Sequence, residues 1–472
     1  MTGGKGLRKY FIADRPFYRE VLQLAAPMAV QNAISNVVSL LDNVMVGSVG
    51  TMQMSAVAIV NQLMLIFYLC IFGATAGAGI YGAQFFGKGD HEGVRVAMRY
   101  KLVLTVAFAA LATAVFIFFG EPLIKLYLSD STSAAEAAET LSYAKDYLHI
   151  MLIGTMPFAV TQCYASMLRE VSHTKPPMVA SITAMAVNFV FNGLLIFGLF
   201  GFPKLGVVGA AIATVLSRFV EAVIVIFAAH RGKTCRVYFE HLYSHFRIPR
   251  KLAGDMTKKA VPLVANEFGW SIAQAAILQT YSLRGLGVVA ALNIANTISM
   301  VFIQFFFSLG GAASIMVGQR LGADDLDDAK FTAFRMLALS LEVSVIIGLF
   351  LCGLAPFIPQ IYNTTDEIRT IAMWMLIILG MFSPVNGMAN SLYFTLRSGG
   401  KAFITFIFDS GFNLVITLVV VNLLIKLTDL PILPVYAIAN ALEILKCIIG
   451  FIILKSGIWA HNLVKNAEVQ EV

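Results

Sequence analysis

Acidic side chains are rare in the long apolar stretches of this sequence, and each could bind a cation. Asp42 and Glu267 lie inside such stretches, and Asp409 lies near the start of another. A charge at the centre of a membrane costs about 2.5–3.5 kcal/mol on insertion scales, so acids there are the first candidates for function. A carboxyl group away from water is most stable when neutral, whereas bound Na⁺ or an organic cation stabilises its ionised form. Such a group can exchange one cation for another.

Amides and an aromatic residue accompany these acids at helical spacing. Asn266 precedes Glu267 and Trp270 follows it by three residues, so the carboxylate and the indole share one helix face. An organic cation could bind there by charge and cation–π attraction, and a structural ion pair is the competing interpretation. Asn188 and Asn192 lie four residues apart on one face. They could serve a cation site or join two helices by hydrogen bonds, and both possibilities stay open.

For several other polar residues, a structural role is an alternative to a functional one. Asp42 could cap the end of its helix, and Asp409 could either face a cavity or cap a helix. Glu443 and Lys446 lie three residues apart, so we expect their charges to neutralise one another. The polar residues that could line a cavity for a substrate are Asn61, Gln62, Tyr68 and Asn296.

The elements that must position these residues are membrane-spanning helices. Of the 472 residues, 58% are hydrophobic and 13% are charged, whereas soluble domains carry about a quarter charged residues. The apolar residues fall in stretches of about 20, the helix length that crosses a hydrocarbon core. A membrane β-barrel would instead show alternating polarity. The twelve predicted spans are 21–45, 54–82, 98–119, 142–168, 178–200, 207–229, 258–282, 287–318, 331–354, 368–396, 402–425 and 432–455.

The positions of lysine and arginine orient these spans. Positive residues collect on the cytoplasmic side of a membrane. With both termini in the cytoplasm, the opposite loops hold only six of the 34 Lys and Arg residues. The net charge of +7 is therefore attributed to topology and contact with anionic membrane lipids, not to nucleic acid. The predicted organisation is a cytoplasmic segment at 1–20, an N-lobe of helices 1–6 at 21–230, a basic cytoplasmic linker at 231–257, a C-lobe of helices 7–12 at 258–456 and a cytoplasmic tail at 457–472.

The two halves of the chain repeat each other at a shift of 235 residues. Between residues 56 and 90, ten of 35 aligned positions are identical, among them Gln84 with Gln319 and Gly87 with Gly322. Each repeat holds an even number of spans, so both halves have the same orientation. The sequence predicts an all-α membrane protein with twelve transmembrane helices in two six-helix bundles. A pseudo-two-fold axis along the membrane normal would relate them, with a substrate site between the lobes.

Motifs at matched positions of the two halves carry a family resemblance. They are Leu41–Gly47, Gly82–Asp90 with its counterpart Val317–Asp325, and Leu168–Arg169 and Lys175 with their counterpart Leu396–Lys401. Together they resemble the multidrug and toxic compound extrusion (MATE) family, cation-coupled antiporters, over about residues 15–460. The segment Pro262–Trp270, and Glu443 with Lys446, are similar to a branch of this family common in Firmicutes.

The resemblance implies roles for several residues. The aspartate that matches Asp42 is the coupling carboxylate of the family's N-terminal lobe. Family members often carry an asparagine and an aspartate where this chain has Asn188 and Asn192, so one charge is missing here. Thr214 matches a hydroxyl that can complete the cluster, and Asp409 matches a family position. The missing acid leaves Na⁺ and H⁺ both open as the coupling ion.

The leading hypothesis is a monomeric exporter of small organic cations, amphipathic drugs or metabolites in exchange for Na⁺ or H⁺. It would lie in the bacterial inner membrane, with no cofactor and, as its one metal, a possible Na⁺ at Asp42. The alternative is a flippase for a lipid-linked or polyanionic precursor of the same superfamily. Such flippases often carry basic residues in the cavity, whereas these spans hold acids and amides. No Walker A motif, His/Cys metal cluster or nucleophile–base arrangement supports an enzyme.

Overall fold

The computed structural model describes residues 10–128, 133–233, 235–244, 246–465 and 467. The first nine residues of the predicted N-terminal segment and residues 468–472 of the predicted tail lie outside these.

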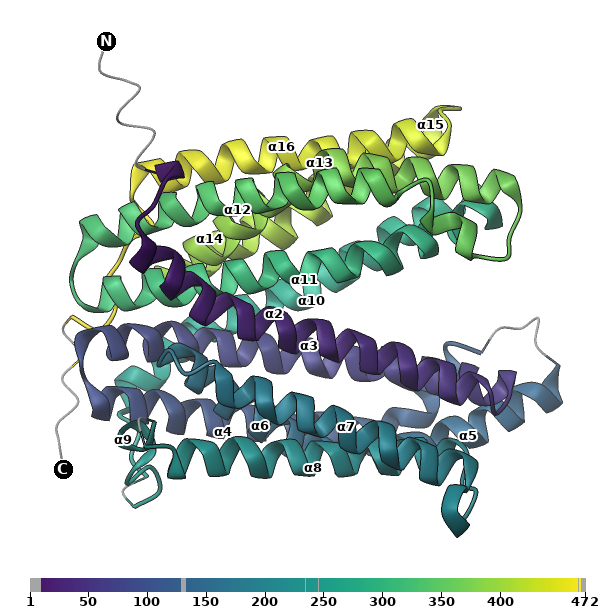
Figure 1. Ribbon diagram of the computed structural model, residues 1–472, viewed down its shortest axis with the longest axis horizontal. Coiled ribbons are helices and arrows are strands. Elements are labelled where there is room, and N and C mark those ends of the chain that lie inside the picture. The colour runs from purple at the N-terminus through teal and green to yellow at the C-terminus, as the bar shows by residue number, and fades with distance from the viewer. Residues whose placement is uncertain (1–9, 129–132, 234, 245, 466, 468–472) are drawn as a thin grey trace. The chain divides into compact units, whose positions relative to one another are not determined.

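The regular elements of the described chain are all helical (Figure 1). The first half contains α2 (Arg15–Gly47), α3 (Thr51–Lys88), α4 (His91–Lys125), α5 (Ala134–Ile153), α6 (Thr155–Glu170), α7 (Lys175–Phe197), η1 (Leu199–Gly201), α8 (Val207–Arg231) and α9 (Arg236–Phe239).

The second half follows the same order of long helices. It contains α10 (Arg250–Ser282), α11 (Leu286–Gly322), α12 (Leu326–Leu354), η2 (Ile358–Ile361), α13 (Asp366–Ser398), α14 (Ala402–Phe406), η3 (Ile407–Gly411), η4 (Asn413–Thr417), α15 (Leu418–Leu427) and α16 (Ile432–Ser456). Both η3 and η4 are π-helical turns, so the predicted eleventh span is a helix that widens in its middle.

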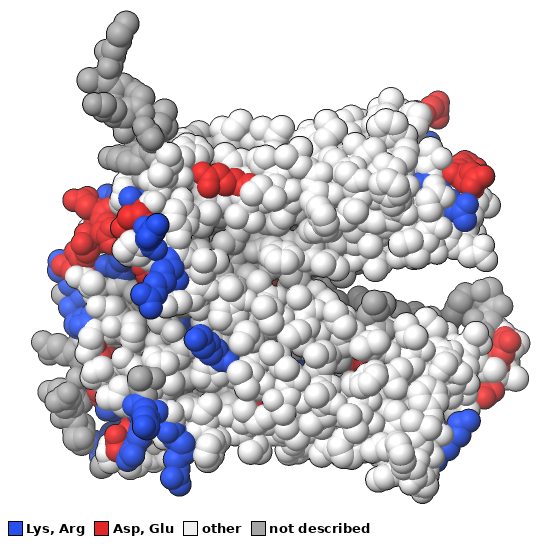
Figure 2. Space-filling model, in the orientation of Figure 1, with Lys and Arg blue, Asp and Glu red and all other residues white. Residues whose placement is uncertain are grey.

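The predicted spans all coincide with helices. Ten helices of the described chain are long and apolar enough to cross a membrane, and the pair α5–α6 makes an eleventh. Helix α10 covers the remaining predicted span, and it carries Asn266 and Glu267 in its apolar part. Charged side chains gather at the ends of the helices, and an almost uncharged band lies between (Figure 2). The chain is therefore an all-α membrane protein with twelve spanning helices, as predicted.

The fourth span differs from its prediction because it is broken. A bend of 45° separates α5 from α6. Gly154 ends one helix and begins the next, and its amide donates to Met151 at 3.0 Å. Pro157 has no amide hydrogen for the carbonyl of Ile153, so the hydrogen-bond ladder cannot continue across this point.

The chain packs as two compact units. The N-unit comprises Val30–Gly82 and His91–Ala260, with Val469–Val472 beyond the described residues. The C-unit comprises Val261–Glu468, Ala83–Asp90 and Met1–Ala29. The first turns of α2 belong to the C-unit because Phe17, Val21 and Leu24 are buried in one core with residues of α11 and α12. The limits predicted for the lobes, 21–230 and 258–456, remain predictions.

The two copies of the repeated glutamine–glycine motif contact each other within the C-unit. A Cβ on Gly87 would collide with the backbone of Gln319, and a Cβ on Gly322 would collide with the backbone of Gln84. Only glycine allows backbones to approach so closely. The sequence repeat therefore corresponds to a reciprocal contact between the ends of α3 and α11.

Candidate functional site

The N-unit brings together the four residues that were predicted from the sequence to take part in cation coupling. Asn192 donates to Asp42 Oδ1 at 2.5 Å and to Asn188 Oδ1 at 3.0 Å. Asn188 in turn donates to Thr214 Oγ1 at 3.3 Å. These side chains come from α2, α7 and α8, and the spacing of four residues on α7 places both amides on one face. Asn188 and Asn192 are buried, whereas Asp42 is half-buried and accessible.

This cluster has a donor set that suits Na⁺. A hard monovalent cation prefers oxygen ligands, and the Asp42 carboxylate and the Asn192 amide supply them. Asn192 Oδ1 is buried without a hydrogen-bond partner in the described residues. An unpaired buried acceptor is costly, so a bound cation is one way to satisfy it. Rotation of the Asn192 amide would turn Oδ1 in place of Nδ2 toward Asp42.

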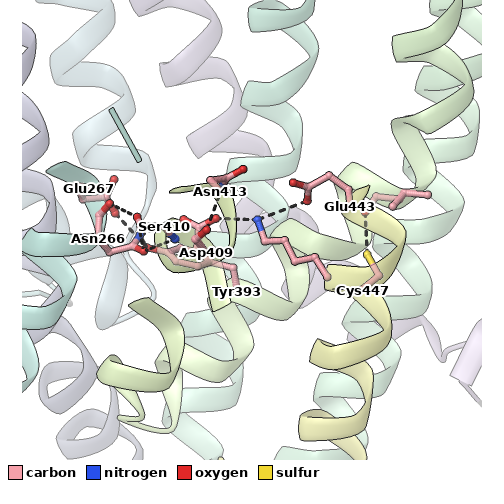
Figure 3. A network of polar contacts seen from close by, with 10 residues as sticks. Asn266, Glu267, Tyr393, Asp409, Ser410, Asn413, Glu443 and Cys447 are labelled. Atoms are coloured by element: carbon pink, nitrogen blue, oxygen red, sulfur yellow. Dashed lines mark hydrogen bonds and ion pairs between the residues drawn. The ribbon is translucent and has the colours of Figure 1, made fainter. Parts of the chain in front are cut away.

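The C-unit contains a second polar cluster around Glu267, shown in Figure 3. Tyr393 donates its hydroxyl to Glu267 Oε1 at 3.0 Å, and Asn266 donates to that hydroxyl at 3.2 Å. Asn266 Nδ2 also lies 3.1 Å from Asp409 Oδ2. The backbone amide of Ser410 donates to Asn266 Oδ1 at 3.2 Å, which fixes the direction of the amide. The cluster thus joins α10 and α13 to the π-helical turn η3.

Asp409 and Lys446 continue this cluster into α16. Lys446 Nζ lies 2.8 Å from Asp409 Oδ1 and 3.4 Å from Glu443 Oε2. The predicted contact between Glu443 and Lys446 is therefore present, but the closer partner of the lysine is Asp409. Asn413 donates to the backbone carbonyl of Asp409 at 3.1 Å, which helps to satisfy the widened π turn. Asp409 is thus ion-paired inside the C-unit.

The remaining candidate residues for substrate binding differ in their exposure and packing. Asn61, Gln62 and Trp270 are exposed and Asn296 is half-buried. Amides exposed on the face of a spanning helix are costly against lipid, which favours a water-filled cavity beside them. Tyr68 instead packs its ring against Phe158 at 4.5 Å between ring centroids, so its contribution is at least partly structural.

Sequence reasoning did not identify three buried polar groups, two in the C-unit cluster and one in the N-unit. Nothing in the sequence distinguishes Tyr393 from the many other aromatic residues of the spans, and nothing distinguishes Ser410 either. The third is a buried ion pair in the N-unit, with Lys101 Nζ 2.6 Å from Glu170 Oε1. Lys101 lies ten residues into α4 and Glu170 ends α6, so their spacing in the sequence does not predict contact.

A cleft of about 430 Å³ lies in the N-unit. Its lining residues belong to the end of α8 and the basic linker: His230, Arg231, Arg236, Phe239, Glu240, His241, Leu242, Tyr243 and Ser244. His230 is separated from Thr214 by about 24 Å along α8, at 1.5 Å per residue. The cleft is therefore distinct from the cation cluster of the N-unit.

A family model described as MatE matches residues 27–194 and 262–426, most of the chain. The probable multidrug resistance protein NorM of Thermotoga maritima is 24% identical over 385 residues, which cover 81% of this chain and 80% of that protein. The multidrug resistance protein NorM of Aliivibrio fischeri is 27% identical over 368 residues, 77% of each chain.

Solved structures share the fold. A crystal structure of MATE in complex with MaL6 gives a TM-score of 0.84 at 17% identity and covers 97% of this chain and 99% of that one. A MOP superfamily transporter from Pyrococcus furiosus gives 0.83 at 18% identity with the same coverage. The predicted placement in a branch common in Firmicutes stays a prediction. The chain belongs to the MatE family of multidrug and toxic compound extrusion transporters, and it is a multi-pass inner-membrane transporter, not an enzyme.

Proposed function

We propose that this protein exports small organic cations or amphipathic drugs in exchange for Na⁺ or H⁺, by alternating access between its two lobes. The observation that carries the proposal is the Asp42 cluster, in which one half-buried carboxylate contacts a buried amide whose oxygen is unpaired. A carboxylate in this setting stabilises one monovalent cation and can release it when the site opens to the other side. Relatives named multidrug resistance proteins support export as the direction of transport.

The charges in the spans favour a cationic cargo over an anionic one. Arg218 in α8 forms an ion pair with Glu221 at 3.3 Å, and Lys446 in α16 forms one with Asp409. Their positive charge is thus compensated within the same unit. Glu267 and Asp42 accept hydrogen bonds from neutral donors, the hydroxyl of Tyr393 and the amide of Asn192. The proposal includes cytoplasmic termini, a monomeric transporter and contact of the basic linker with anionic lipids.

The experiment is ethidium transport by everted membrane vesicles or proteoliposomes under an imposed Na⁺ or H⁺ gradient. Transport driven by one gradient, and lost when that gradient is collapsed, would support the proposal and identify the ion. Folded protein that transports no cation under either gradient would refute it. In that case flipping of a lipid-linked precursor, measured with a fluorescent lipid analogue in the same vesicles, becomes the function to test.

A further inference from the structure

The basic linker between the two halves is fixed to the N-unit by the short segment that carries α9. Phe239 is only 1% exposed, and its ring stacks on that of Tyr164 with 5.6 Å between the centroids and 12° between the planes. Leu242 is also buried, and Arg99 of α4 donates to the backbone carbonyls of Leu242 and His241 at 2.9 and 3.2 Å. A segment that is packed and hydrogen-bonded in this way presents its other side chains in a fixed arrangement.

This segment and the end of α8 form the cleft of about 430 Å³. Two arginines line it, Arg231 from α8 and Arg236 from α9, and Glu240 is the one acid among its described lining residues. Glu240 forms an ion pair with Arg236 at 3.0 Å, but the two side chains are 42% and 62% exposed, so the pair can open at low cost. One acid cannot compensate two arginines, and the cleft therefore carries a net positive charge.

Two histidines add hydrogen-bonding capacity to the lining of the cleft. His230 ends α8 with its Nε2 atom 3.0 Å from the Tyr164 hydroxyl, and His241 belongs to the docked segment. The backbone of His241 has a φ of 59°, in the left-handed region that residues with a Cβ rarely adopt. Such a conformation persists only when its surroundings hold it, and here the guanidinium of Arg99 does so. Arginine and imidazole groups held in one cleft suit an anion with several oxygens, such as a phosphate group.

The cleft lies where a spanning helix reaches the surface of the membrane. His230 directly follows the predicted span 207–229. Tyr243 in the lining and Phe246 just beyond it are 58% and 46% exposed. Lys and Arg side chains gather at the end of the N-unit where α9 lies (Figures 1 and 2). Exposed aromatic rings next to basic side chains are typical of the headgroup layer, so a phosphate that belongs to a membrane lipid fits this cleft better than a dissolved one.

We propose that this cleft binds the phosphate of one anionic phospholipid headgroup from the adjoining leaflet. Arg231 and Arg236 bind its oxygens, and the phosphate replaces Glu240 as the partner of Arg236. The site is separate from the cation cluster of the N-unit, so the inference goes beyond the proposed transport. It rests on the proposed function only for the contact of the basic linker with anionic lipids, which it assigns to one defined cleft.

The test measures lipid binding to the purified full-length protein in detergent by native mass spectrometry. The probes are phosphatidylglycerol and, as the zwitterionic control, phosphatidylcholine. We expect the first phosphatidylglycerol to bind more tightly than the first phosphatidylcholine. The double variant Arg231→Gln with Arg236→Gln should weaken the first phosphatidylglycerol by about tenfold, because charge-assisted hydrogen bonds to phosphate are stronger than neutral ones. Equal binding of the two lipids to the unmodified protein would overturn the proposal.

Two further variants attribute the effect to the cleft. Glu240→Gln should act in the opposite direction and tighten the binding of phosphatidylglycerol, because the carboxylate no longer competes with the phosphate for Arg236. Arg247→Gln with Lys251→Gln is the matched control, since it removes the same two charges from exposed positions of the linker and α10 that do not line the cleft. If this control weakens binding as much as the loss of the two cleft arginines does, diffuse surface charge attracts the lipid and the proposal falls.

Inorganic phosphate distinguishes the two sources of the ligand group. In excess over the lipid, it should not displace phosphatidylglycerol beyond the effect of ammonium acetate at equal ionic strength. Complete displacement would assign the cleft to soluble phosphate and overturn the lipid assignment. No transport is measured, so the inference and the proposed function can fail separately. Cation-driven transport with lipid binding that ignores the cleft arginines keeps the function and removes the site, and the reverse pair of results keeps the site and removes the function.

Discussion

At the scale of single residues, the two polar clusters differ in how much of their charge is already compensated. Asp42 contacts the neutral amide of Asn192, whereas Asp409 contacts the charged ammonium group of Lys446. A compensated acid has little affinity left for an external cation, while an acid with neutral donors still attracts one. We therefore expect Asp42 and Glu267, not Asp409, to determine how the protein handles cations.

Asp42→Asn should abolish gradient-driven ethidium efflux, because the amide cannot hold a cation by charge. The protein should still insert and elute as a single species in size-exclusion chromatography, since the replacement has nearly the same shape. Asn192→Asp is the informative companion. It adds a second acid beside Asp42, which should increase the dependence of transport on protons, because two adjacent carboxylates share a proton readily. Efflux that persists in Asp42→Asn at the unmodified rate would remove Asp42 from the mechanism.

Glu267→Gln should weaken the binding of cationic substrates more than that of neutral ones, because only a cation loses its counter-charge. The measurement is the Kd for tetraphenylphosphonium against that for a neutral dye of similar size. Tyr393→Phe is the matched control, since it removes the hydroxyl that donates to Oε1 and leaves the carboxylate in place. Equal weakening of both ligands in Glu267→Gln would show that this residue has a structural role.

At the scale of the elements, the ends of α3 and α11 meet through glycines at equivalent positions of the repeat. Each glycine lies against the backbone of the glutamine from the other copy of the motif. Gln84 also donates to the carbonyls of Ser398 and His461, at 3.2 and 3.1 Å. A small glycine thus recurs where the two helices end, which explains in packing terms why both copies of the motif contain one.

Gly87→Ala should destabilise the protein, because its added Cβ would collide with backbone atoms that cannot move aside. Overpacking of this kind costs about 1–3 kcal/mol. Gly322→Ala should cost a similar amount. The two changes together should be non-additive, since both widen the same contact. Thermal unfolding in detergent measures this, with Gly254→Ala as the control at a glycine that has open space around it. Melting temperatures equal to that of the control would contradict the close contact.

At the scale of the whole molecule, the orientation in the membrane is a proposal based on the distribution of positive charge. Arg247 in the linker and Lys204 between α7 and α8 are both exposed and should lie on opposite sides of the membrane. The proposal therefore has a direct test by site-specific labelling.

In a background without the five native cysteines, Lys204→Cys should react with a membrane-impermeant maleimide on intact spheroplasts. Arg247→Cys should react only after permeabilisation, because the linker is expected in the cytoplasm. The reverse pattern would invert the orientation and exchange the two sides in the proposed transport cycle. Labelling of both sites on intact spheroplasts would indicate leaky membranes, which an internal soluble marker enzyme detects.

The sequence alone determined the class of this protein, its helices and its repeat, because a hydrocarbon layer constrains composition over every stretch of about 20 residues. It also gave Asp42, Asn188, Asn192 and Glu267 as candidate site residues, since polar residues are conspicuous in apolar helices. Only the tertiary structure paired Asp409 with Lys446 and placed Tyr393 on Glu267. Those features depend on which helices become neighbours, and side chains far apart in the chain meet only after the helices have packed.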